Sequence, residues 1–352
     1  MSAAFHTTPG YSFHPAPRSD PDDDRDASTH PDTALRTYLA RMEDALSSAA
    51  SEGEIPELAR LSGAEEDQIG IALCSVDGEI TAVGSEHAFP IQSISKAFAY
   101  GAAIDLHGLE YVNSIVDEEP TGEEFNALSL DAETKKPKNP LVNIGAIRTH
   151  AMLGPTQPER TRRLRDVLDA AAGRALEVHE ETYQAELDSA DRNLALAYML
   201  RAAGSMTENA EDVVGGYTEG CSVLVSVADL AVMAATLAGG GTNPITGVEV
   251  FSRVASRQVL SVMLTCGMYD NAGDWVSDVG MPAKSGVGGG IIAALPSRFG
   301  VATYAPQLDQ HGNSVRGTLA FERFSGDFAL HMLDGQEPMD LERRAEELVR
   351  IP

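Results

Sequence analysis

The sequence predicts an α/β protein of the α+β type, with a mostly antiparallel sheet built from both chain ends and a helical subdomain inserted between them. Paired apolar runs with short connections occur near both ends, and such connections are typical of antiparallel strands. The middle of the chain carries apolar residues at helical spacing instead. Because the sheet needs strands from both ends, we expect one folded unit over residues 33–335.

Two hairpins account for four of the predicted strands. The first joins apolar runs at residues 69–74 and 79–83 through an Asp-Gly turn, which is a strong hairpin signal. The second joins residues 290–295 and 299–304. A further apolar run at residues 318–323 is expected to add a fifth strand.

Helices are predicted from apolar residues that recur at three- and four-residue steps. One such stripe begins near Thr33. Four later segments share the spacing, at residues 159–174, 192–203, 227–237 and 250–264. Ser226, followed three residues later by Asp229, resembles a capping box at the start of the third of these helices.

The two ends of the chain are expected to lie outside this unit. Residues 1–32 hold few aliphatic side chains and a cluster of aspartates, as a disordered acidic tail does. Residues 336–352 form a charged tail that is compatible with a short helix. The chain has no apolar run of about 18 residues, and its start lacks a secretory pattern. We therefore expect a cytoplasmic protein without a membrane partner.

The composition excludes several kinds of partner and cofactor. A net charge of −27 repels nucleic acid and anionic membranes. The three cysteines are far apart, and we expect them to be reduced and mostly packed. The scattered histidines lack metal-ligand spacing, so we expect neither a metal nor another cofactor. The acidic surface with only five lysines indicates tolerance of salt, or alternatively a genome whose base composition favours arginine codons.

The pattern S-x-x-K at Ser93 and Lys96 suggests nucleophilic chemistry. It opens an apolar stretch at residues 97–104 that reads as a buried helix, so the two side chains share a face. A serine hydroxyl needs a base to become a nucleophile, and a buried lysine with a lowered pKa can serve as one. The alternative is a helix cap with a solvated lysine, but the residues after Lys96 are apolar.

A second pattern, K-S-G at residues 284–286, precedes a predicted strand at residues 287–295. Together with S-x-x-K it resembles the motifs of serine β-lactamases and penicillin-binding proteins. Lys284 is expected to place a second cation beside Lys96 and so keep one of the two neutral. The third motif, S-D-N, is missing, and we interpret Tyr111 and Asn113 as packing and a turn.

Several segments, in order along residues 33–333, resemble the serine-dependent glutaminases, a family with the β-lactamase-like fold. The matching segments are residues 91–96, 139–146, 186 with 191–193, 217 with 221–222, 264–270 and 282–290. The resemblance implies hydrolysis of L-glutamine to L-glutamate and ammonia. It also implies a homo-oligomer, often a tetramer.

The resemblance also implies roles for individual residues. Ser93 carries the γ-glutamyl ester, Lys96 acts as the base or polarises a tyrosine that does, and Tyr269 relays a proton to the departing ammonia. Backbone N–H groups of Ser93 and Val287 hold the oxyanion. The residues implied to clamp the free amino acid end of glutamine are Asn143, Glu186, Asn193 and Tyr217, with Gln92 nearby.

One position departs from the family pattern. The family usually has a tyrosine before Ile-Pro-Glu-Leu, and this sequence has Glu54 there. We expect Glu54 to point away from the site. Two alternatives stay open at this point: a β-lactamase or peptidoglycan peptidase, and a glutamine-binding module without turnover.

Overall fold

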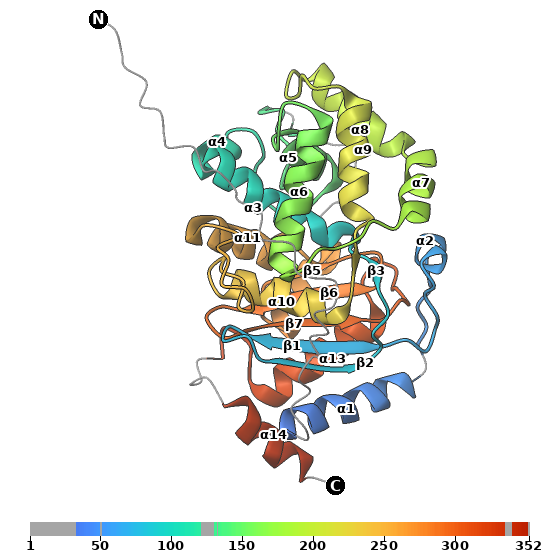
Figure 1. The fold of residues 1–352 in the computed structure, drawn as a ribbon, viewed down its shortest axis with the longest axis vertical. Coiled ribbons are helices and arrows are strands. Elements are labelled where there is room, and N and C mark those ends of the chain that lie inside the picture. The colour runs from blue at the N-terminus through green and yellow to red at the C-terminus, as the bar shows by residue number, and fades with distance from the viewer. Residues whose placement is uncertain (1–32, 50, 121–129, 132, 335–339, 351–352) are drawn as a thin grey trace, which may run out of the picture. The chain divides into compact units, whose positions relative to one another are not determined.

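The structure is a computed structural model that describes residues 33–49, 51–120, 130–131, 133–334 and 340–350 (Figure 1). The acidic tail predicted for residues 1–32 lies outside the described residues. The C-terminal segment carries helix α14 (Leu341–Val349), which packs against α1 (Ala34–Ser47). Within the described residues, no helix is both long and apolar enough to cross a membrane.

A five-stranded antiparallel sheet joins the two ends of the chain, as predicted. Its order is β2-β1-β7-β6-β5. The strands are β1 (Gly70–Ser75), β2 (Ile80–Gly84), β5 (Ala283–Ser285), β6 (Gly290–Leu295) and β7 (Phe299–Tyr304). The two predicted hairpins are confirmed, and β1 pairs with β7 along its whole length, from Gly70 opposite Tyr304 to Ser75 opposite Phe299.

The fifth strand is β5, so the strand predicted at residues 318–323 is wrong. That run lies in helix α13 (Val315–Phe328). Ser314 caps the helix by accepting a hydrogen bond from the Gly317 N–H, and the buried side chains recur at helical spacing. The strand predicted over residues 287–295 is also too long, because residues 286–289 form a turn between β5 and β6.

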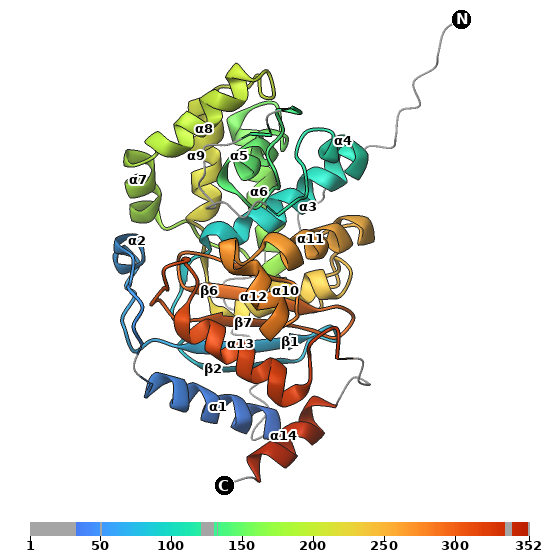
Figure 2. The same cartoon turned by 180° about the vertical axis from the view of Figure 1, so that it is seen from behind.

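Helices cover both faces of the sheet (Figures 1 and 2). Helix α10 (Val227–Ala238), which is almost entirely buried, packs on one face, and α1 and α13 pack on the other. Alternate residues of each strand separate into these two layers; Ala72 and Cys74 join the core under α10, whereas Ile71 and Leu73 join the core under α1 and α13. Because alternate side chains point to opposite faces of the sheet, the strands contribute to two separate hydrophobic cores.

The predicted helices of the middle are present with shifted ends. They are α6 (Gln157–Ala172), α8 (Asp191–Ala202), α10 and α11 (Arg253–Cys266). The capping box of Ser226 and Asp229 is confirmed. Helix α11 begins later than predicted because Ser252 caps it, accepting a hydrogen bond from the Ala255 N–H.

The helical subdomain and the remaining short elements complete the fold. The subdomain also contains α3 (Ser95–His107), α4 (Leu109–Asn113), α5 (Asn143–Ala151), α7 (Glu180–Asp188) and α9 (Ala210–Cys221). The short elements are α2 (Glu57–Leu61), α12 (Ala272–Asp278), and the paired strands β3 (Phe89–Pro90) and β4 (Leu224–Val225).

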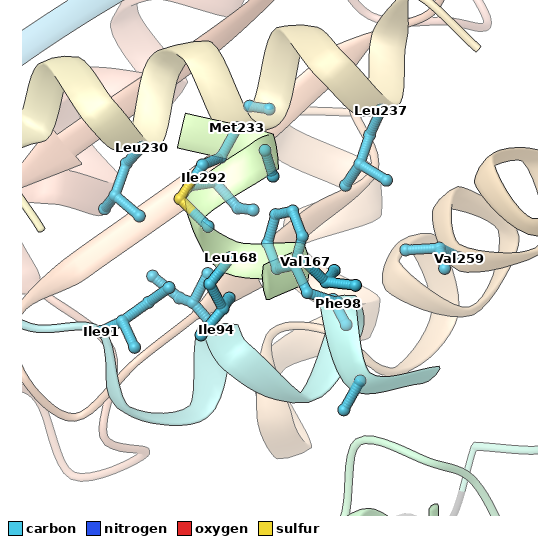
Figure 3. Packing of buried hydrophobic residues seen from close by; sticks show 14 of the residues in the cluster. Ile91, Ile94, Phe98, Val167, Leu168, Leu230, Met233, Leu237, Val259 and Ile292 are labelled. Atoms are coloured by element: carbon cyan, nitrogen blue, oxygen red, sulfur yellow. The ribbon is translucent and has the colours of Figure 1, made fainter. Parts of the chain in front are cut away.

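Ile91 and Ile94, which flank Ser93 in the sequence, are fully buried in the hydrophobic core (Figure 3). Side chains from α3 and its approach pack with residues of α6, α10, α11 and β6. The residues labelled in the figure are Ile91, Ile94, Phe98, Val167, Leu168, Leu230, Met233, Leu237, Val259 and Ile292. Close packing on several sides fixes the backbone that presents Ser93.

Candidate active site

Ser93 lies in a single 3-10 turn, η1 (Gln92–Ile94), directly before α3. We predicted it in the first turn of the helix itself, so the structure places it slightly earlier. Gln92 has a φ of +53°, which non-glycine residues rarely adopt. The Ser95 hydroxyl donates to the Gln92 carbonyl at 2.8 Å, and Gln92 Nε2 donates to Glu186 Oε1 at 2.6 Å. These bonds hold the strained residue that precedes the serine.

Lys96 is almost fully buried one turn beyond Ser93, with 1% of its surface exposed. Its Nζ donates to Asn143 Oδ1 at 2.6 Å and to the Leu141 carbonyl at 3.2 Å. Burial lowers the pKa of Lys96 to about 8, although the neighbouring Cys221 and Glu186 act in the opposite direction. Part of the amine is therefore neutral near neutral pH and able to accept a proton.

Lys284 and Tyr269 form the opposite side of the site. Lys284 lies fully buried on β5, donates to the Gly267 carbonyl at 3.0 Å, and has its Nζ 4.2 Å from the centre of the Tyr269 ring. Burial, and then the charge of Lys96, lower the pKa of Lys284 well below its ordinary value. Of the two buried lysines, Lys284 is therefore the one whose charged form its neighbour disfavours.

Tyr269 begins a 3-10 turn, η2 (Tyr269–Asn271), with a φ of +56°. Its hydroxyl donates to the Ser285 carbonyl at 3.1 Å. Burial raises the pKa of Tyr269, and a hydrogen bond with Ser93 partly offsets that rise. The phenol is therefore neutral and in contact with the serine hydroxyl, which suits it to pass a proton.

The residues that we predicted to bind the substrate also come together. Asn143 starts α5, and its Nδ2 donates to Oδ1 of Asn193 on α8 at 3.2 Å. Glu186 on α7 accepts from Gln92; its pKa is raised by burial, and lowered in part by that bond and by Lys96. Tyr217 on α9 is buried beside Glu186. Glu186 supplies carboxylate oxygens that accept hydrogen bonds, and Asn143 and Asn193 supply amide groups that can both donate and accept.

The glycine-rich turn at residues 286–289 packs against the serine segment. A Cβ on Gly286 would lie 2.9 Å from the Ile91 carbonyl oxygen, and one on Gly288 would lie 2.5 Å from that of Pro90. Only glycine permits this approach. The turn is closed by the N–H groups of Gly286 and Gly289. Val287, between the two glycines, therefore sits at the serine segment.

Two further residues take part in the site, and our sequence reasoning missed them as such. Ser95 supports Gln92, and its Oγ lies 3.7 Å from Cys221 Sγ. Cys221 is buried beside Tyr217 and Lys96. A signal was available, because Tyr217 and Cys221 are four residues apart on α9 and so share a face. The three cysteines are free, as predicted.

Two other residues singled out in the sequence have exposed side chains. Glu54 is exposed, and its backbone exchanges hydrogen bonds of 2.9 Å and 2.8 Å with Leu308. Tyr111 on α4 is 51% exposed, so its interpretation as a packing residue is wrong. Its ring lies 5.3 Å from that of His107.

Comparison with known proteins identifies many relatives. A family model described as Glutaminase matches residues 51–333. The glutaminase of Microcystis aeruginosa is 43% identical over 307 residues, covering 86% of this chain and 90% of the relative. The glutaminase of Corynebacterium efficiens is 42% identical over 315 residues, covering 88% of this chain and 74% of the relative.

Solved structures agree with this result. The crystal structure of Mglu in its glutamate form has a TM-score of 0.82 and 44% identity, covering 87% of this chain and 71% of that chain. A probable glutaminase, ybaS, has a TM-score of 0.82 and 31% identity, covering 86% of this chain and 99% of that chain. The similarity therefore extends over the sheet and the helical subdomain alike.

Proposed function

The chain belongs to the glutaminase family, and we propose that it hydrolyses L-glutamine to L-glutamate and ammonia through an acyl-enzyme on Ser93. Its fold is the β-lactamase-like fold of these enzymes. The observation that carries the proposed mechanism is the contact of Ser93 with the Tyr269 phenol, one turn from the buried Lys96.

The first half of the reaction forms the ester. Neutral Lys96 accepts the Ser93 proton as Oγ attacks the γ-carbonyl carbon of glutamine. The N–H groups of Ser93 and Val287 stabilise the oxyanion. The C–N bond then breaks, and Tyr269 passes a proton to the leaving nitrogen, which departs as ammonia. Protonated Lys96 then returns its proton to the Tyr269 phenolate, which leaves Lys96 neutral again.

The second half regenerates the enzyme. Water loses a proton to the same base and attacks the γ-glutamyl ester, and the Ser93–carbonyl bond breaks. Ser93 regains its proton and glutamate leaves. Lys284 does not touch the reacting atoms in this scheme; burial and the charge of Lys96 both favour the neutral form of Lys284.

Release of ammonia from L-glutamine by the purified protein tests this function directly. Absence of release would overturn the proposal. Acylation by a β-lactam would support the alternative of a β-lactamase or peptidase, which the family membership disfavours. Glutamine binding without ammonia release would support the non-catalytic module, which the hydrogen bond between Ser93 and Tyr269 disfavours.

The free amino acid end of glutamine is proposed to bind among Asn143, Glu186, Asn193 and Tyr217. Glu186 is the carboxylate of this group and would accept from the substrate ammonium. Asparagine, one methylene shorter, would then hold its amide carbon short of Ser93 Oγ. We expect kcat/KM for glutamine to exceed that for asparagine by about a hundredfold or more, since a misplacement near 1 Å costs about that much.

Two variants on the same helix test the clamp. Glu186→Gln is expected to raise KM for glutamine strongly, because a neutral amide pairs poorly with the ammonium. Glu180→Gln, at an exposed position of α7, is the matched control and should leave KM unchanged. Equal kcat/KM on glutamine and asparagine would contradict the proposed clamp.

The pH dependence should report the titration of Lys96. Because Lys96 acts as a neutral base, we expect kcat/KM to rise with pH through about 8, the lowered pKa of this amine. At still higher pH the substrate ammonium deprotonates and binding to Glu186 weakens. Measurement of kcat/KM from about pH 6 to 10 checks this. A flat profile between about pH 6 and 9 would exclude Lys96 as the titrating base.

A homo-oligomer, a cytoplasmic location and salt tolerance remain predictions of the sequence. The solved Bacillus glutaminase was crystallised in the presence of 4.3 M NaCl, and it is 31% identical to this chain with a TM-score of 0.79. Retention of activity at about 1 M salt, where the Debye length is about 3 Å, would support the last of these predictions.

A further inference from the structure

The segment of residues 309–313 lies against two residues of the site. A Cβ on Gly312 would lie 3.7 Å from Tyr269 Cε2 and 3.7 Å from Val287 Cγ1. Asn313 Nδ2 donates to the carbonyl of Met268 at 3.4 Å, directly before Tyr269. The segment therefore lies next to both the phenol proposed to relay the proton and the residue proposed to hold the oxyanion.

An ion pair joins this segment to η2. His311 Nδ1 lies 3.0 Å from Oδ1 of Asp270, the residue that follows Tyr269. The segment also has internal support, because Asp309 Oδ1 accepts from the N–H groups of His311 at 2.8 Å and Asn313 at 2.9 Å. The turn is thus formed by its own hydrogen bonds, and the ion pair ties it to Asp270.

Tyr269 needs such support because of its backbone conformation. Its φ of +56° is rare for a bulky residue, and the conformation persists only where neighbouring contacts hold it. Lys284 lies on one side of the ring, and Gly312 lies near the ring edge. Contacts that hold η2 in place therefore bear directly on where the phenol sits relative to Ser93.

We propose that His311 and Asp270 are positioning residues, whose ion pair holds residues 309–313 against Tyr269 and Val287 and so fixes the phenol at Ser93. This inference rests on the proposed role of Tyr269 in the reaction. Neither His311 nor Asp270 touches the reacting atoms. The pair should therefore affect kcat more than KM.

The charge of His311 makes the effect depend on pH. Three carboxylates face it: Asp270 in η2, Asp309 in its own segment and Asp274 in α12. The hydrogen bond to Asp270 raises the pKa of His311, burial partly offsets that rise, and the charges of the three carboxylates add to it. The ion pair is present while His311 is protonated and is lost as pH rises through that raised pKa. The side chains are 32% and 39% exposed, so solvent screening limits the effect to about two- to fivefold.

Replacement of His311 separates this titration from that of Lys96. His311→Arg keeps a positive charge at every accessible pH, whereas His311→Gln never carries one. We expect His311→Gln to have a kcat about two- to fivefold below wild type at about pH 6 and equal to it at about pH 9. The ratio of the kcat of wild type to the kcat of His311→Arg should fall over the same pH range. Lys96 titrates in both proteins, so its effect cancels in this ratio.

The matched control removes an exposed ion pair elsewhere. Glu346→Gln breaks the pair of Arg350 with Glu346 on α14 and should leave kcat unchanged at every pH. Asp270→Asn should resemble His311→Gln. A kcat of His311→Gln equal to wild type throughout, or a loss of the same size in His311→Arg, would overturn the proposal.

Hydrogen exchange gives a readout that does not depend on activity. The N–H groups of Gly312 and Asn313 are bonded within the segment. They should exchange faster in His311→Gln and Asp270→Asn than in wild type and in Glu346→Gln. Unchanged exchange would contradict the positioning role. A wild-type protein that releases no ammonia would instead overturn the proposed function, and exchange would still decide whether the ion pair holds the segment.

Discussion

Ser93→Ala is expected to lower kcat on L-glutamine by at least about a thousandfold, because no other group can take over the ester. Lys96→Ala should be nearly as inactive, since a nucleophile and its base act as one unit. The double variant should lose little beyond either single one. Steady-state ammonia release from the three variants measures this.

Covalent labelling identifies the nucleophile independently of the rate. An electrophilic glutamine analogue should add its mass to the peptide that carries Ser93 in wild type, and no adduct should form in Ser93→Ala. Ser261→Ala is the matched control, because this exposed hydroxyl on α11 donates only to a carbonyl of its own helix. Wild-type turnover in Ser93→Ala would falsify the assignment.

The sheet was predictable because its signals are local. Within each hairpin the two apolar runs and the turn between them lie within a few residues of each other, and all four strands appear where expected. The strand predicted at residues 318–323 was wrong because a short apolar run fits a strand and a helix equally well. What decides there is the cap at Ser314, which lies outside the run.

The site was predictable in composition but not in geometry. Motif spacing placed Lys96 one turn from Ser93, and the family resemblance selected Asn143, Asn193 and Glu186. Spacing does not reveal contacts between residues that are far apart in the sequence. One example is the hydrogen bond from Lys284 to the carbonyl of Gly267, 17 residues earlier. The positive φ of Gln92 was equally hidden, because glutamine carries no signal for a left-handed turn.

Variants of Glu54, the position that departs from the family, and of Tyr269 test whether Tyr269 alone relays the proton. Tyr269→Phe is expected to lower kcat by about a hundredfold or more, the usual scale of acid–base assistance, because it removes the phenol bonded to Ser93 and to the Ser285 carbonyl. Glu54→Gln should stay within a few-fold of wild type, because the Glu54 side chain is exposed and its backbone pairs with Leu308. Steady-state kinetics of both variants against pH measure the difference.

The competing explanation is that Glu54 enters the site when substrate binds. An ionised glutamate only accepts hydrogen bonds and would repel the substrate carboxylate, so it would have to be protonated or act as a second ligand of the ammonium. Glu54→Tyr, which restores the family residue, distinguishes the two explanations. If Glu54 enters the site, this variant should lower activity. If Glu54 stays outside the site, the added tyrosine should donate to the substrate carboxylate and lower KM. If Glu54→Gln loses as much kcat/KM as Tyr269→Phe, Glu54 belongs to the site and Tyr269 does not carry the proton relay alone.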